Sequence, residues 1–150
     1  MSVAPPDVLD TASLREWAIE LGIDELGVCH AKPYAEAEAV IRERVGRGLF
    51  ADMQFTMTRT DVSCHPEKLV DGAQSVISTA LCYWQPDVPD APDAGPLGRI
   101  ARYTRNDAYA ALTARLEVIA AWLRDQGYAA RIFVDSNENV DREAARLSGV

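Results

Sequence analysis

Cysteine is scarce in this sequence, and acidic side chains outnumber basic ones. The 150 residues include three cysteines, Cys29, Cys64 and Cys82. Any disulfide would leave one thiol unpaired, so we expect a reduced, cytoplasmic protein rather than a disulfide scaffold. The 15 Lys and Arg residues against 23 Asp and Glu give a formal net charge of -8. This charge argues against binding nucleic acid through a broad basic surface, but it leaves room for a local basic patch or a basic partner domain.

Long apolar runs and glycine-rich motifs are also missing. No apolar stretch is long enough to span a bilayer, and the first six residues lack the apolar core of a signal peptide, so we expect no membrane segment. Neither common glycine-rich phosphate loop occurs, and no serine stands in a nucleophile elbow. These absences exclude the usual fingerprints of nucleotide-binding proteins and of serine hydrolases.

Both histidines of the chain follow a cysteine, in the pairs Cys29-His30 and Cys64-His65. Adjacent residues of a strand point to opposite faces of the sheet, so Cys29 and His30 do not easily converge on one metal ion. Neither pair has the spacing found between ligands of structural zinc sites. We therefore expect no metal ligands here and interpret the pairs as buried thiols beside surface imidazoles.

The spacing of apolar residues predicts several helices. Two have clear boundaries, one from the N-cap Ser13 to the stop at Gly22 and one from the N-cap Asp107 to Gly127. Residues 36–45 form a further helical pattern, 49–57 a short helix or apolar loop, and the last helix carries Val140, Ala144 and Leu147.

Apolar and alternating runs predict four strands. Ser75–Trp84 is apolar at nearly every position, as in a central strand covered on both faces; the others are Leu26–His30, Arg99–Tyr103 and Ala129–Val134. Four prolines at about residues 85–98 indicate an extended loop rather than a domain linker. This order predicts an α/β fold over residues 1–150, a single-domain α/β sandwich with a mixed central sheet flanked by helices.

Two polar segments are candidate sites. Asp135 and Ser136 end the last predicted strand, and a polar residue there lies where open α/β sheets place their ligands. The plainer interpretation of Asp135 is an N-cap for the next helix. In the other segment, Arg102 and Tyr103 are suited to hold a polar ligand and Asp107 to orient a partner. The alternative there is a solvated strand edge followed by a helix cap.

Five runs of the sequence, taken in order, resemble the N-terminal, cobalamin-binding domain of the epoxyqueuosine reductases. Their order and spacing agree with that family over most of the chain, so an ordered set carries the resemblance rather than any single motif. The runs are Leu21–Val28, Pro66–Ile77, Gly98–Tyr103, Phe133–Ser136 and Asp141–Ala145.

The resemblance implies a reaction and its cofactors. The family reduces epoxyqueuosine in the wobble position of a tRNA anticodon to queuosine, using cobalamin and two 4Fe-4S clusters. On this likeness the residue matching Asp135 protonates the departing epoxide oxygen, which is a poor leaving group until protonated, while the corrin carries the reductive chemistry. The positions that the likeness implies beside the cofactor or substrate are Arg102, Tyr103, Ser136, Asp107 and Tyr109.

The chain departs from the family in two respects. The family continues into ferredoxin-like cysteine clusters and a helical-repeat segment that helps to hold tRNA, whereas this sequence stops at Val150 without the cysteine spacing of such clusters. We therefore expect turnover to require an iron-sulfur domain or redox partner in a longer parent protein, and tRNA contact to need regions outside this chain. The Asp-Tyr-His motif of the family appears here as Asp107-Ala108-Tyr109, with Tyr109 in place of the histidine.

Three alternatives remain beside this hypothesis. The first is a paralogue with a different substrate, which the tyrosine at position 109 favours. The second is a non-catalytic module that binds a cofactor for a separate redox partner or serves only in protein interaction. The third is a flavin-dependent reductase, because α/β sandwiches often bind flavin.

Overall fold

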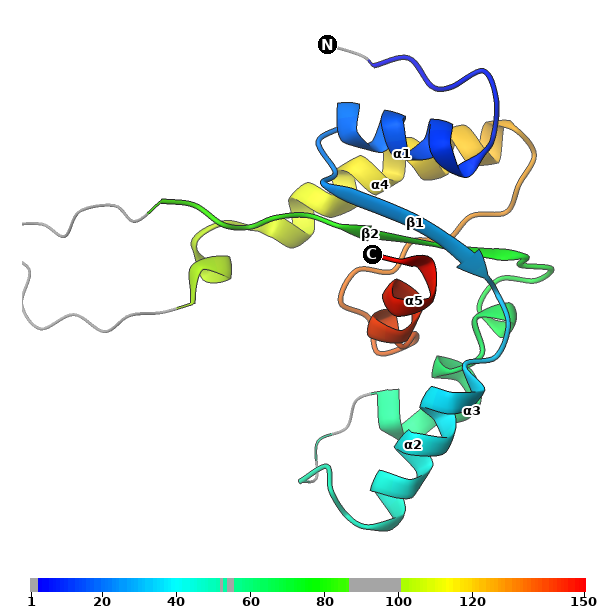
Figure 1. The fold of residues 1–150 in the computed structure, drawn as a ribbon, viewed down its shortest axis with the longest axis vertical. Coiled ribbons are helices and arrows are strands. Elements are labelled where there is room, and N and C mark those ends of the chain that lie inside the picture. Colours follow the sequence, from blue (N-terminus) through cyan, green and yellow to red (C-terminus); the bar gives the residue numbers. More distant parts are fainter. Residues whose placement is uncertain (1–2, 52, 54–55, 87–100) are drawn as a thin grey trace, which may run out of the picture.

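The computed structural model describes residues 3–51, 53, 56–86 and 101–150. It contains both helices and paired strands (Figure 1), so the α/β class predicted from the sequence is confirmed. In chain order the elements are α1 (Thr11–Glu20), β1 (Glu25–His30), α2 (Ala35–Gly46), η1 (Thr56–Arg59), α3 (Thr60–Ser63), η2 (Pro66–Lys68), β2 (Ser75–Ala80), η3 (Arg102–Arg105), α4 (Ala108–Asp125) and α5 (Asp141–Ser148). Most of the predicted proline-rich loop lies outside the described residues.

The strands β1 and β2 pair antiparallel, and helices cover both faces of the ribbon they form. In the register of this pair, Val28 lies opposite Ile77 and Cys29 opposite Val76. Because side chains alternate along a strand, Val28 and Ile77 pack into one core while Val76 packs into another. Figure 1 shows α1 and α4 on one face of the sheet and α5 on the other.

The larger core lies between the sheet and the helices α1 and α4. Trp17 of α1 meets Trp122 of α4 edge to face, with ring centroids 5.3 Å apart. Arg115 of α4 donates from Nε to the carbonyl of Leu21 at 3.0 Å. These contacts fix α4 against α1. The buried residues of this core are Leu14, Trp17, Ala18, Ile23, Leu26 and Ile119.

The opposite face of the sheet carries α5 and a second, smaller core. Tyr34, Cys64 and Ala144 are buried in it. The end of α5 comes so close to β1 that a Cβ added at Gly27 would overlap the carbonyl group of Ser148. A glycine at position 27 therefore lets α5 lie directly on the strand.

The run Ala129–Val134 forms no strand, so this prediction is wrong. The guanidinium of Arg124 donates instead to the Ala130 carbonyl at 2.9 and 3.1 Å, and the guanidinium of Arg131 lies 4.6 Å from the ring centroid of Phe133. β-Propensity is local, whereas a strand also needs a neighbour to pair with. Within the described residues, the only strands that pair are β1 and β2.

Other predicted boundaries shift. The strand predicted from Ser75 ends at Ala80 and is mostly half-buried, and Arg102 and Tyr103 belong to η3 rather than to a strand. Helix α1 begins at Thr11, two residues before the predicted N-cap Ser13, because the carboxylate of Asp10 accepts from the Ser13 amide at 2.8 Å and acts as the N-cap. The helices predicted at 36–45, from Asp107 and at the end of the chain are confirmed, as is the strand at 26–30.

Candidate functional site

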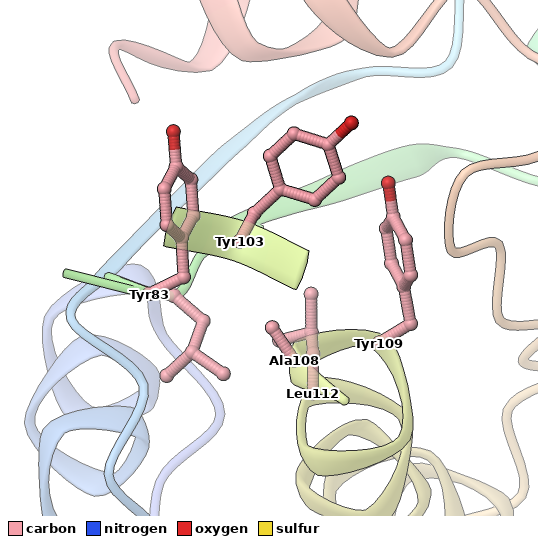
Figure 2. Close-up of a pocket in the computed structure, with 6 residues that line it drawn as sticks. Tyr83, Tyr103, Ala108, Tyr109 and Leu112 are labelled. Atoms are coloured by element: carbon pink, nitrogen blue, oxygen red, sulfur yellow. The ribbon is translucent and has the colours of Figure 1, made fainter. Parts of the chain in front are cut away.

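A pocket of about 320 Å³ lies where the chain leaves β2 and where α4 begins. Apolar side chains and three tyrosine rings form its walls. In Figure 2 the hydroxyl groups of Tyr83, Tyr103 and Tyr109 point to the same side. The lining residues are Leu81, Tyr83, Tyr103, Ala108, Tyr109 and Leu112. No charged side chain is among them, so the polar side-chain groups of the wall are tyrosine hydroxyls.

Local hydrogen bonds hold the backbone on two sides of this pocket. The Asp24 carboxylate accepts from the Cys82 amide at 2.7 Å, and the Asp24 amide donates to the Ala80 carbonyl at 3.1 Å. These bonds direct the chain as it leaves β2. On the other side, the carboxylate of Asp107 accepts from the Ala110 amide at 2.8 Å and caps α4, as an Asp at this position is expected to do.

The turn η3 brings Tyr103 into contact with Tyr83. Thr104 bonds back to the Ala101 carbonyl through its amide at 3.1 Å and its hydroxyl at 2.7 Å. The rings of Tyr103 and Tyr83 meet edge to face with centroids 6.1 Å apart, a preferred aromatic geometry. Each of these tyrosines is 52% exposed. Their remaining surface is therefore open to a ligand.

Arg102 lies beside the pocket rather than in its wall. It donates from Nη1 to the Gln85 carbonyl at 2.6 Å, and its Cζ lies 5.3 Å from the centroid of the Trp84 ring. A guanidinium stacked on an exposed aromatic ring keeps its charge at the surface. Arg102 is thus a positive group next to the tyrosine wall.

Asp135 lies near the pocket, on the side of Tyr109. Its carboxyl group, as a hydrogen-bond acceptor and as a negative charge, raises the pKa of the Tyr109 hydroxyl. Asp135 itself is exposed and is not one of the lining residues. The carboxyl group therefore lies behind the Tyr109 side of the pocket.

The backbone around Asp135 differs from both sequence-based interpretations. No strand precedes it. It is not the N-cap of α5 either, because Val140 holds that position and no side chain caps the helix. The φ angle of Asp135 is 49°, in the left-handed region, where Asp is one of the more common residues other than glycine. The carboxyl group is thus left for interactions outside the helix.

Ser136 and Asp107 make local contacts. The Ser136 hydroxyl accepts from the Glu138 amide at 3.2 Å, and Asp107 caps α4. Of the predicted site residues, the structure brings Tyr103 and Tyr109 together in one pocket, with Asp135 next to Tyr109.

Sequence analysis did not identify Leu81, Tyr83 or Leu112 as pocket residues. Leu81 and Tyr83 were included in a strand that in fact ends before them, and Leu112 lies within the helix that was predicted from Asp107 to Gly127. The available signal was Tyr83-Trp84, two large aromatic residues directly before a proline-rich stretch.

The cysteine-histidine pairs show no metal-site geometry. Cys64 is buried, while the ring nitrogens of His65 face Glu67 at 2.9 Å and Glu38 at 3.2 Å. Among the residues that the structure describes, no group of three or more His, Cys, Asp or Glu side chains is arranged to hold a metal ion. The three cysteines are free thiols.

None of the described helices is both long and apolar enough to cross a membrane.

The chemistry of this arrangement suits a flat ligand with polar edges. Tyrosine rings offer apolar faces, and their hydroxyls both donate and accept hydrogen bonds. A carboxyl group near the wall is of the type that acts as a general acid or base.

Comparison with known proteins points to one family. The family model described as "Epoxyqueuosine reductase QueG, DUF1730" matches residues 64–136. An epoxyqueuosine reductase of Leadbetterella byssophila is 32% identical over 140 residues, which are 91% of this chain and 45% of that protein. The chain therefore spans less than half the length of this relative.

Solved structures of epoxyqueuosine reductases have a fold similar to that of this chain. A crystal structure of epoxyqueuosine reductase with an epoxyqueuosine-modified tRNA-Tyr stem loop matches with a TM-score of 0.79 and 20% identity, over 91% of this chain and 37% of that one. The epoxyqueuosine reductase from Streptococcus thermophilus matches with a TM-score of 0.74 and 19% identity, over 93% of this chain and 38% of that one. The α/β arrangement of this chain is thus the one found in these enzymes.

Proposed function

We propose that this chain is the cobalamin-binding part of an epoxyqueuosine reductase-like oxidoreductase, which removes the epoxide oxygen in tRNA queuosine synthesis together with iron-sulfur domains. The similarity to an epoxyqueuosine reductase over 140 residues supports the reaction class. The observation that carries the proposal is the tyrosine-walled pocket, with Asp135 near enough to Tyr109 to raise the pKa of its hydroxyl. Reductive opening of an epoxide needs an acid beside the bound cofactor.

The pocket fits one edge of a corrin rather than the whole macrocycle. Its volume of about 320 Å³ is at the lower end of the roughly 300–1,000 Å³ typical of small-molecule sites, and a corrin with its amide side chains is larger than most such ligands. Tyr83, Tyr103 and Tyr109 would hold that edge, with their rings on its apolar surface and their hydroxyls on its amides. The rest of the cofactor would be covered by the iron-sulfur domain or a redox partner.

Cobalamin, when bound, supplies the reducing metal centre for the reaction. The residues of this chain would bind the cofactor, shield the site from water and supply a proton. Asp135 donates a proton from its carboxyl group to the departing epoxide oxygen, and the rings of Tyr83 and Tyr103 exclude water from one side of the site. Arg102, Ser136 and Asp107 remain proposed contacts on the strength of the resemblance.

The proposed partners are a tRNA and a source of electrons. One solved structure of similar fold contains a tRNA stem loop. With a net charge of -8, this chain would leave most phosphate contacts to other regions of the complete protein. Iron-sulfur clusters in those regions would deliver the electrons. The free thiols are consistent with work in the reducing cytoplasm.

A reductase with a different substrate is the second candidate. Tyr109 lines the pocket, at the position where the Asp-Tyr-His motif has histidine. A phenol in place of an imidazole changes both the shape and the hydrogen bonds of the wall. Such a paralogue would still bind cobalamin and use Asp135, but it would leave the epoxyqueuosine of tRNA unchanged.

A turnover assay separates these functions. A longer parent protein that contains the iron-sulfur domains is mixed with hydroxocobalamin, titanium(III) citrate as the electron source, and an epoxyqueuosine-modified tRNA stem loop, and the loss of one oxygen is followed by mass spectrometry. We expect conversion by the wild type and about 100-fold slower conversion by Asp135→Asn, with equal cobalamin binding. Equal rates would remove Asp135 from the chemistry. Bound cobalamin without any conversion would favour the second candidate.

A further inference from the structure

We infer that Trp84 is a stacking residue for RNA: its indole ring receives an unpaired base of the RNA that carries the substrate, beside the tyrosine-walled pocket. The inference rests on the proposed function, because that function supplies the RNA. It concerns a side chain that is not among the lining residues of the pocket.

Exposed aromatic side chains gather where the chain leaves β2 and where α4 begins. Among the described residues, five tyrosine or tryptophan side chains are more than half exposed, and four of them belong to this region: Tyr83, Trp84, Tyr103 and Tyr109. The fifth, Tyr128, follows the other end of α4. Trp84 is the most exposed of the five, at 62%. An exposed surface of neighbouring aromatic rings is typical of a binding site.

Arg102 holds the Trp84 ring in place. The guanidinium Cζ lies 5.3 Å from the ring centroid, and Nη1 of the same group donates to the carbonyl of Gln85, the next residue, at 2.6 Å. Directly beside this contact, the rings of Tyr83 and Tyr103 meet edge to face with centroids 6.1 Å apart (Figure 2). Two neighbouring contacts thus join the two segments. A ring that is fixed before its ligand arrives loses little conformational freedom on binding.

The two segments that carry Trp84 and Arg102 are positively charged, although the whole chain has a net charge of -8. Residues 80–86 and 101–106 include two arginines, Arg102 and Arg105, and no Asp or Glu. Both arginines belong to the turn η3. Positive charge next to an exposed ring favours the approach of a phosphate backbone.

Two carboxylates lie near these segments, those of Asp24 and Asp107. Each accepts from a backbone amide, at 2.7 and 2.8 Å respectively, so part of their charge is balanced by an amide dipole. Surfaces that bind single-stranded nucleic acid combine positive charge with aromatic rings on which bases stack. The combination at Trp84 therefore favours an RNA base over an apolar protein side chain as the occupant of the ring.

The place of Trp84 in the chain suits this role. It follows Tyr83, which lines the pocket, but lies outside the wall itself. A base stacked on Trp84 holds the RNA beside the pocket, so that a neighbouring nucleotide, extruded from its own stack, can enter it.

The first test measures the affinity of the longer parent protein, without cobalamin, for the unmodified tRNA stem loop by fluorescence anisotropy. Trp84→Ala should weaken binding about tenfold, whereas Trp84→Phe keeps a ring and should weaken it by no more than about threefold. The matched control is Tyr128→Ala, which removes an exposed ring beyond the other end of α4 and should leave the affinity unchanged. Equal affinity in wild type and Trp84→Ala would overturn the inference.

A set of abasic stem loops identifies the stacked base. Each unpaired base of the loop is removed in turn, and the affinity is measured for the wild type and for Trp84→Ala. At one position we expect base removal to weaken wild-type binding about tenfold and to leave binding by Trp84→Ala almost unchanged, because the base and the ring lose the same contact. If Trp84→Ala weakens binding by the same factor with every stem loop, the ring stacks on no base and the inference fails.

These measurements separate the inference from the proposed function. Binding that depends on Trp84 in a protein that converts no epoxyqueuosine supports the stacking role and refutes the proposed reaction alone. Conversion with equal stem-loop affinity in wild type and Trp84→Ala refutes the stacking role alone. A wild-type parent protein that does not bind the stem loop refutes both.

Discussion

Gly27 is the position where the docking of α5 on the sheet can be tested most sharply. A Cβ built on this residue overlaps the carbonyl oxygen of Ser148 and lies 2.9 Å from both the carbonyl carbon of Ser148 and Cγ2 of Val150. The Ser148 end of α5 has little freedom to retreat, because its hydroxyl bonds to the Ala144 carbonyl at 2.8 Å and the Val150 amide bonds to the Ala145 carbonyl at 3.0 Å. Gly27→Ala should therefore displace α5 or strain β1.

The magnitude follows from two opposing effects. Forcing a methyl group against backbone atoms in a packed interface costs about 1–3 kcal/mol. Alanine in the interior of a strand regains about 0.5–1 kcal/mol relative to glycine, because the unfolded chain is less flexible. The midpoints of these ranges give a net loss of about 1.25 kcal/mol in the free energy of unfolding. For a chain of this length it corresponds to a fall in Tm of roughly 2.5–5 °C.

Gly46 provides the matched control. It is the last residue of α2, and a Cβ added there meets nothing within 4 Å. Gly46→Ala should therefore raise the free energy of unfolding by about 0.5–1 kcal/mol. Urea unfolding followed by circular dichroism measures both variants. If Gly27→Ala is as stable as the wild type, or shifts in the same direction as Gly46→Ala, α5 does not lie on β1 as described here.

Three further predictions concern the support of the site and the cores. Asp107→Ala removes the N-cap of α4 and should lower the free energy of unfolding by about 1 kcal/mol, measured by urea unfolding; no change would mean that water caps the helix equally well. Tyr34→Phe removes a buried hydroxyl that has no hydrogen-bond partner among the described residues, so stability should stay equal or rise by up to about 1 kcal/mol, and a clear loss on thermal unfolding would contradict this. The Arg146 guanidinium lowers the pKa of Glu143 in the folded chain. The stabilisation from this pair is therefore fully present at a pH above the ordinary pKa of glutamate, and it is lost as the pH falls through the lower pKa of the folded state. In Glu143→Gln the free energy of unfolding, measured by urea unfolding at a series of pH values, should therefore fall less toward acidic pH than in the wild type. The same fall in both proteins would refute a stabilising role for the Glu143–Arg146 pair.

Local sequence patterns predicted the start and the end of α4, because both depend on interactions between residues that are close in the sequence. Asp107 was predicted as an N-cap because a short carboxylate before an apolar helical stripe satisfies free amides, and it caps α4 in the structure. Gly127 adopts a left-handed φ of 89° just after the helix ends, as a glycine stop requires. At α1 the predicted N-cap Ser13 is wrong, because the carboxylate of Asp10 accepts from the Ser13 amide and holds that position.

The failures come from interactions between distant parts of the chain. Ala129–Val134 has the composition of a strand, but pairing depends on a partner that sequence patterns do not reveal. Tyr83 was missed because the apolar run before it continued past the true end of β2. The pocket itself joins Tyr83 to Tyr103 and Tyr109 across distant parts of the chain, and no local periodicity encodes it.

The central claim is that the wall formed by Tyr83, Tyr103 and Tyr109 holds cobalamin, and equilibrium binding tests it most directly. Hydroxocobalamin is titrated with the chain, and binding is followed through its visible absorption bands and by equilibrium dialysis. The account predicts saturable 1:1 binding with a Kd of tens of micromolar or lower, weakened about tenfold, or 1.4 kcal/mol, by Tyr103→Ala. Absence of binding at about 100 µM, or binding that Tyr103→Ala leaves unchanged, would contradict it.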